Sequence, residues 1–153
     1  MRKICCFAGH HDFYDTDNTK ERLIQLITEL IENEGVNEFW VGHYGRFDAL
    51  AGECVRKVKK KYSHIKLNLV IPYVTDEINE YKEFYYRDYD NILIADIPEN
   101  APMRFHISYC NKYMVQRSEF IICYVLHSWG GAAQTVKYAK NQKHIKVFNL
   151  AEN

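Results

Sequence analysis

The sequence has no long hydrophobic run and no net charge. No segment approaches the ~20 apolar residues of a membrane-spanning helix, and the apolar run near the start is too short for a signal peptide. The 20 Lys and Arg residues balance the 20 Asp and Glu residues, which disfavours attraction to nucleic acid or to an anionic membrane surface. We therefore expect a cytoplasmic protein without a membrane partner. Residues at the binding site itself must compensate the charge of any ligand.

The spacings typical of disulfide frameworks and metal sites are also missing. The five cysteines are an odd number, and the adjacent Cys5 and Cys6 match neither a disulfide framework nor a CxxC pair. We interpret the cysteines as packed thiols in a reducing compartment. Four histidines near predicted strand ends lack metal-ligand spacing, namely His10, His11, His43 and His127. We predict no metal and no cofactor.

The two common nucleotide-binding motifs are absent, but the chain alternates between strand and helix patterns. Neither GxGxxG nor GxxxxGK[ST] occurs, so a dinucleotide fingerprint and a Walker NTPase both lack support. Helical patterns separate continuous apolar runs, which are typical of strands in a parallel sheet covered on both faces. The predicted strands lie near residues 3–7, 38–41, 66–71, 91–95, 119–125 and 145–149. We predict an α/β fold, a Rossmann-like three-layer domain with a mostly parallel sheet, as one domain over residues 1–153.

Glycine occurs in three of the predicted strand-to-helix loops, at residues 9–11, 42–45 and 128–131. The carboxyl ends of parallel strands meet at one edge of the sheet, so we expect these loops to line one pocket. Gly130-Gly131 precedes a predicted helix, and the N–H groups at a helix N-terminus favour a phosphate. A plain strand-to-helix turn explains the glycine pair equally well, and both interpretations stay open.

Four stretches of the sequence together resemble a known superfamily. They are "CCFAGHH", "GRFDALAGECVRKVKKKYSHIKLNLVIPY", "NKYMVQRSEFIICYV" and "WGGAAQTVKYAK", and they cover nearly the whole chain. In this order they resemble the YpsA-like branch of the SLOG superfamily, which includes Smf/DprA and Lonely Guy relatives. The resemblance implies binding of a nucleotide or nucleotide derivative. The resemblance and the glycine loops together predict these ligand-binding residues: Gly9, His10, His11, Gly42, Gly45, Asp48, Asn111, Trp129, Gly130, Gly131 and Ala132.

Some residues depart from the pattern of the superfamily. His11 stands where the branch usually has arginine, and Ala132 stands where it has threonine. The Lonely Guy phosphoribohydrolases use an arginine in a Met-x-x-Arg element, which Met114 and Arg117 resemble, and a glutamate after their glycine motif. Residues 133–135 contain no carboxylate, although N-glycosidic cleavage normally requires one. The resemblance therefore favours binding over catalysis and leaves enzymatic activity open.

Three side chains each allow two interpretations. Asp48 either stabilises a helix N-terminus or contacts the ligand. Arg117 either binds a phosphate or pairs with an acidic neighbour, Glu119 or Asp96. Trp129 either stacks on a base or packs within the protein.

We predict binding or sensing of a nucleotide or nucleotide derivative, and homo-oligomer formation is left open. The alternative is a phosphoribohydrolase-like N-glycosidic hydrolase of nucleosides or nucleotides, with Arg117, Asp48 and Glu53 as candidate catalytic residues. A weaker alternative is single-stranded nucleic-acid binding through the basic run at residues 56–61, which the neutral net charge disfavours.

Overall fold

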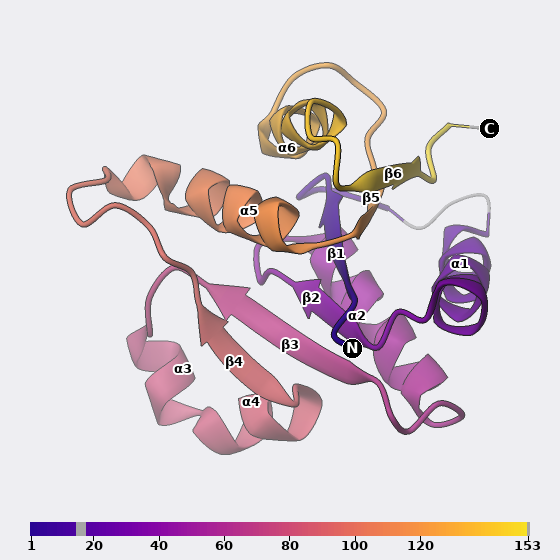
Figure 1. Ribbon diagram of the computed structural model, residues 1–153. Helices are drawn as coiled ribbons and strands as arrows, with labels where there is room; N and C mark the ends of the chain where they lie inside the picture. Colours follow the sequence, from indigo (N-terminus) through magenta and orange to yellow (C-terminus); the bar gives the residue numbers. More distant parts are fainter. Residues whose placement is uncertain (15–17, 153) are drawn as a thin grey trace.

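The structure is a computed structural model that describes residues 1–14 and 18–152 of the chain (Figure 1). Six strands form one sheet in the order β4-β3-β2-β1-β5-β6, and every pairing is parallel. The strands are β1 (Ile4–Gly9), β2 (Glu38–Val41), β3 (Lys66–Ile71), β4 (Asn91–Ile94), β5 (Phe120–Tyr124) and β6 (Lys146–Asn149). The predicted α/β class is confirmed, and each strand falls at its predicted place, although β1 continues past residue 7 to Gly9.

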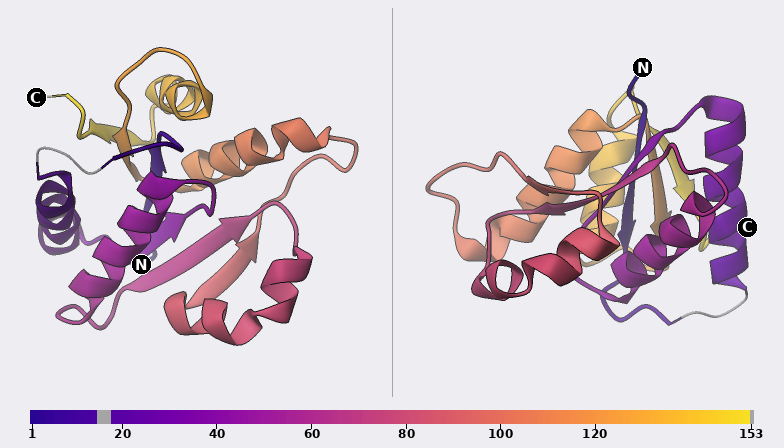
Figure 2. Two further views of the ribbon diagram at one scale, coloured as in Figure 1. Left: turned by 180° about the vertical axis from the view of Figure 1, so that it is seen from behind. Right: turned by 90° about the horizontal axis from the view of Figure 1, so that it is seen from below.

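Helices cover both faces of this sheet (Figures 1 and 2). They are α1 (Thr19–Glu34), α2 (Arg46–Lys59), α3 (Asp76–Glu80), α4 (Lys82–Asp88), the 3-10 turn η1 (Met103–Phe105), α5 (His106–Arg117) and α6 (Gly131–Lys140). One buried cluster joins the sheet to α1 and α2, and a second joins its other face to α5 and α6. The polar, tyrosine-rich stretch between β3 and β4 contains two short helices, α3 and α4, which lie beside these strands. Within the described residues, no helix combines the length and apolar character needed to cross a membrane.

The central strand β1 shows why the strands are continuously apolar. Its side chains alternate, so that Cys5 and Phe7 join the cluster of α1 and α2, whereas Cys6 and Ala8 join the cluster of α5 and α6. A strand between two helical layers has no face in water, and polar alternation is therefore missing. All five cysteines are buried and free, as the interpretation of packed thiols requires.

The order of the strands reverses beside β1. From β1 the chain adds β2, β3 and β4 in one direction, and α5 then returns it to β5 on the other side of β1. The two strands end level with each other, because Gly9 pairs with Tyr124. In open parallel sheets, ligands bind beyond the carboxyl ends of the strands at such a reversal.

Candidate functional site

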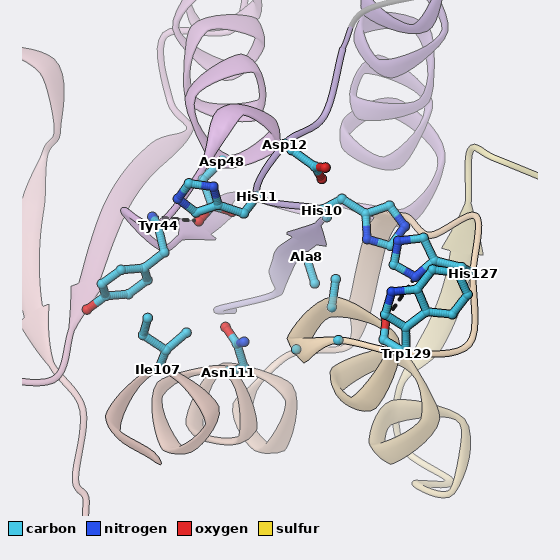
Figure 3. Close-up of a pocket in the computed structure, with 14 residues that line it drawn as sticks. Ala8, His10, His11, Asp12, Tyr44, Asp48, Ile107, Asn111, His127 and Trp129 are labelled. Atoms are coloured by element: carbon cyan, nitrogen blue, oxygen red, sulfur yellow. Dashed lines mark hydrogen bonds between the residues drawn. The ribbon is translucent and has the colours of Figure 1, made fainter. Parts of the chain in front are cut away.

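A cavity of about 350 Å³ lies at this reversal, beyond the ends of β1 and β5 (Figure 3). Its walls come from the loop after β1, the start of α2, the start of α5 and the loop that leads into α6. The lining residues are Ala8, Gly9, His10, His11, Asp12, Tyr44, Asp48, Ile107, Asn111, His127, Trp129, Gly130, Gly131 and Ala132. The structure thus brings together every predicted ligand-binding residue except Gly42 and Gly45.

Gly42 and Gly45 lie behind the cavity wall and allow its parts to approach each other. A Cβ atom on Gly42 would lie 3.1 Å from Oδ2 of Asp48, and one on Gly45 would lie 2.7 Å from the Cα of His11. The N–H of Arg46 also donates to the carbonyl of His11 at 3.0 Å. These two glycines therefore support the site through backbone packing, and the sequence prediction that they line the pocket is corrected.

Asp48 lies in the first turn of α2 and turns its carboxyl group toward the cavity. Its Oδ2 atom accepts a hydrogen bond from the N–H of Tyr44 at 3.1 Å, which closes the loop ahead of the helix. Burial raises the pKa of Asp48 to about 6, although the Tyr44 N–H and the nearby His11 oppose that rise. The two interpretations of Asp48 are thus compatible, since one carboxyl group both orders the helix start and faces the cavity.

Three aromatic side chains form a stack along one wall, as Figure 3 shows. The rings of His10 and His127 have centroids 3.9 Å apart, and the centroids of His127 and Trp129 are also 3.9 Å apart. His127 donates from Nδ1 to the carbonyl of Trp129 at 2.9 Å, because a carbonyl can only accept. Trp129 packs on His127 with one face of its ring but remains 68% exposed, so another ring can still stack on Trp129.

The four histidines near strand ends do not form one cluster, although three of them line the cavity. His11 lines the cavity opposite the stack, whereas His43 lies in a separate cavity, where its Nε2 lies 3.2 Å from the hydroxyl of Tyr85. Among residues 1–14 and 18–152, no three histidine, cysteine or acidic side chains are grouped so as to hold a metal ion.

The N-terminus of α6 is open at the cavity wall. Gly130 has φ +94°, a backbone conformation that favours glycine, and Gly131 begins the helix. No side chain caps this end, and its first turn contains no acidic residue. A Cβ atom on Gly131 would meet nothing within 4 Å. The geometry of the turn therefore explains why residue 130 is glycine, but it does not explain why residue 131 is glycine. The absence of a side chain at Gly131 leaves open space beside the unpaired N–H groups of the helix.

Two of the three candidate catalytic residues lie away from the cavity. Arg117 ends α5, and its guanidinium lies over the ring of Tyr113, 3.8 Å from the centroid. Glu53 is exposed on α2 and pairs with Lys20 at 2.8 Å. Only Asp48, of the three, lines the cavity, so a catalytic role for Arg117 or Glu53 has no support from the geometry.

The structure also gives other contacts to Arg117, to its expected partner Glu119 and to the basic run. The carboxylate of Glu119 accepts the N–H of Ile4 at 2.9 Å, while Arg117 packs on Tyr113. In the basic run 56–61, Lys59 pairs with Asp90 at 2.5 Å. This run ends α2, at the opposite end of the helix from Asp48.

The predicted ligand-binding residues do not include five residues that line the cavity, namely Ala8, Asp12, Tyr44, Ile107 and His127. Ile107 had a usable signal, because it precedes Asn111 by four residues and so shares its face of α5. Tyr44 lies within a glycine loop that we expect at the pocket, but nothing in the pattern distinguishes its side chain from its neighbours.

Comparisons with known proteins agree with this fold. No protein-family model matches the chain. It is 26% identical over 140 residues to a UPF0398 protein of Halalkalibacterium halodurans, covering 86% of this chain and 72% of the relative. The structure of DNA processing protein A (DprA) from Streptococcus pneumoniae matches with a TM-score of 0.67 and 16% identity, over 97% of this chain and 50% of that one. The Chlamydomonas rheinhardtii Moco carrier protein matches with a TM-score of 0.56 and 14% identity, over 99% of this chain and 77% of that one.

The fold is a Rossmann-like α/β domain with a cavity at the strand reversal. The similarity to DprA shows a shared fold, and together with the distant similarity to the UPF0398 protein it agrees with the resemblance of the sequence to the SLOG superfamily. The chain spans half the length of the DprA chain that it matches.

Proposed function

We propose that this protein binds a nucleotide or nucleotide derivative in the cavity beyond β1 and β5. The observation that carries this proposal is the open N-terminus of α6 in the wall of a cavity at the strand reversal. A helix N-terminus carries about half a positive charge and unpaired N–H groups, which together attract a phosphate. The open space beside Gly131 lets a phosphate approach these groups closely.

The charges around the cavity favour a ligand with one phosphate group. The lining residues include two carboxylates, Asp12 and Asp48, but no lysine or arginine. A di- or triphosphate would bring several negative charges toward one helix end and two acidic groups. We therefore expect a nucleoside monophosphate or cyclic nucleotide to bind better than a triphosphate.

Other lining residues suit the sugar and the base. Asp48 can accept hydrogen bonds from ribose hydroxyl groups, since a carboxylate has more acceptor sites than the Tyr44 N–H uses. The exposed ring of Trp129 offers a stacking surface for a base. On the opposite wall, Tyr44 and Ile107 provide apolar surface beside the Asn111 amide.

The test is a thermal-shift and calorimetric comparison of AMP, cyclic AMP, ADP-ribose and ATP, with ribose and inorganic phosphate as partial ligands. We expect AMP or cyclic AMP to raise the melting temperature and to bind more tightly than ATP and than either partial ligand. Absence of binding by all of the nucleotides would contradict the proposal. Tighter binding of ATP would contradict the preference for one phosphate.

A second candidate function, N-glycosidic hydrolysis, rests on Asp48. A cavity carboxyl group with a pKa of about 6 can hold or release a proton near neutral pH, as cleavage of a glycosidic bond requires. Chromatography of the same incubations would detect free base if the reaction occurs. Release that persists in Asp48→Asn would show that Asp48 is not the catalytic carboxyl group.

A further inference from the structure

The loop that leads into α6 is held to the end of β1 by a histidine. The N–H of Leu126 donates to Nε2 of His10 at 2.9 Å, across 116 positions of sequence. A backbone N–H can only donate, so Nε2 carries a lone pair and His10 is neutral with its proton on Nδ1. The neighbouring Val125 is held separately, since its N–H donates to Oδ1 of Asn149 at 3.0 Å. His10 thus secures the loop at Leu126, directly before His127, which lines the cavity.

Protonation of His10 is incompatible with this arrangement. A proton on Nε2 would place two donors against each other and leave the Leu126 N–H without its acceptor. The ring of His10 also stacks on His127, which in turn stacks on Trp129, next to Gly130 and the α6 N-terminus. Loss of the Leu126 contact would therefore loosen the stack and the loop that positions the α6 N–H groups.

Among the residues that the structure describes, few charged groups lie around His10. His127 faces it from the β5–α6 loop, and Asp12 lies on its own loop. Asp48 and His11 line the cavity from the α2 side, while α5 contributes the uncharged Ile107 and Asn111. Behind the β5–α6 loop lie Lys137, Lys140 and Glu152. The α6 N-terminus adds partial positive charge, which opposes a second cation nearby.

The direction of the titration agrees with this geometry. Burial lowers the pKa of His10, the neighbouring His127 lowers it further, and Asp12 opposes the change. His10 is therefore neutral at neutral pH, and it gains its proton at a lower pH than an unperturbed histidine does.

We propose that His10 is a positioning residue whose neutral ring holds the β5–α6 loop in its ligand-binding arrangement, so that acidification releases the loop and weakens binding of the anionic ligand. The binding part of this inference rests on the proposed nucleotide function, whereas the release of the loop does not. The two parts can therefore be tested separately.

The first test needs no ligand. The amide resonance of Leu126 is followed by NMR from about pH 7.5 to about pH 4.5 in the wild type, in His10→Gln and in His64→Gln. The glutamine side-chain oxygen offers an acceptor that does not titrate, and His64 is an exposed histidine outside the cavity. We expect the Leu126 amide to lose its hydrogen-bonded shift in the wild type and in His64→Gln as the pH falls, but not in His10→Gln.

The second test measures binding of cyclic AMP, whose phosphodiester keeps one charge over this range. We expect affinity to fall roughly 5- to 10-fold between about pH 7.5 and about pH 5 in the wild type and in His64→Gln, the loss of about one hydrogen bond. In His10→Gln it should change far less. Protonation of Asp48 removes a negative charge from the cavity, so it acts in the opposite direction and cannot mimic this loss.

The outcomes separate the two proposals. An unmoved Leu126 amide in the wild type, or equal pH dependence of cyclic AMP binding in the wild type and His10→Gln, would overturn the role of His10. If no nucleotide binds at any pH, the proposed function fails, and the Leu126 titration still decides whether His10 controls the loop. If His10→Gln does not fold, the pH midpoint of the Leu126 amide shift is compared with that of the His10 ring resonances in the wild type. Different midpoints for the two signals would contradict the inference.

Discussion

Gly45 lies directly against the backbone of His11, so closely that a Cβ atom at Gly45 would stand 2.7 Å from the His11 Cα. The adjacent Arg46 donates its N–H to the His11 carbonyl at 3.0 Å. These contacts join the loop after β1 to the start of α2, and both segments form walls of the cavity. The position of Asp48 relative to His11 therefore depends on a residue that does not itself line the site.

Gly45→Ala should lower the unfolding free energy by about 1–3 kcal/mol, because the His11 backbone must move to admit the new methyl group. Gly131→Ala is the matched control, since a Cβ atom there meets nothing within 4 Å and the residue has no positive φ. We expect Gly131→Ala to leave the unfolding free energy unchanged or to raise it by up to about 1 kcal/mol. Denaturant unfolding of both variants measures these changes. Equal decreases in unfolding free energy would show that the close contact at Gly45 does not determine the effect.

Ala132→Asp should separate stability from binding. A carboxylate in the first turn of α6 favours the helix by about 0.3–1 kcal/mol, whereas it repels a phosphate at the same N–H groups. Ala132→Asn has nearly the same shape without the charge and serves as control. We expect Ala132→Asp to unfold at the same or higher temperature while binding AMP more than about tenfold more weakly than Ala132→Asn. Unchanged AMP affinity in Ala132→Asp would mean that the glycine pair only forms a turn.

Asp48→Asn should change how stability depends on pH. Because the pKa of Asp48 is raised from 3.8 to about 6, the folded protein keeps a proton between these values that the unfolded chain has released. The wild type therefore loses stability as the pH rises through this window, and the loss remains above it. We expect Asp48→Asn to be more stable than the wild type at about pH 7, by at most about 3 kcal/mol, with the difference vanishing near pH 4.

Denaturant unfolding at several pH values measures this effect. Glu53→Gln is the control, because we expect the opposite dependence of stability on pH for this residue. The hydrogen bond and charge of Lys20 lower the pKa of Glu53, so its stabilisation is present at neutral pH and is lost on acidification. A stability difference between Asp48→Asn and the wild type that stays constant with pH would refute the raised pKa.

Trp129→Ala should weaken AMP binding by about tenfold, because base stacking on an aromatic ring contributes about 1–3 kcal/mol. It should leave binding of ribose 5-phosphate unchanged, since that ligand has no base. Trp129→Phe should retain part of the AMP affinity. Equal weakening of both ligands in calorimetry would show instead that Trp129 acts through its stack on His127.

The sheet could be predicted from the sequence because its central strands β1 and β5 lie between two helical layers and are therefore apolar almost throughout. The stretch between β3 and β4 could not be resolved in the same way. It is polar and rich in tyrosine, and α4 has no buried residue, so its sequence lacks the periodic apolar face that marks a helix boundary.

The lining of the cavity was predictable where it depends on strand ends, whereas the Met-x-x-Arg spacing did not place Arg117 at the cavity. The loops after β1 and β5 meet because parallel strands share an edge. Arg117 follows Asn111 by six residues, which is about 9 Å along α5, so the helix carries it away from that edge. The His10–Leu126 hydrogen bond had no local signal, because its partners are 116 positions apart.

The most direct measurement of the central claim is an NMR titration of the amide resonances with AMP. The account predicts that the largest shifts fall on Gly130, Gly131 and Ala132, with further shifts near Asp48 and Asn111. Shifts confined to the basic run 56–61 or to the cavity beside α4, or no shifts at all, would contradict it.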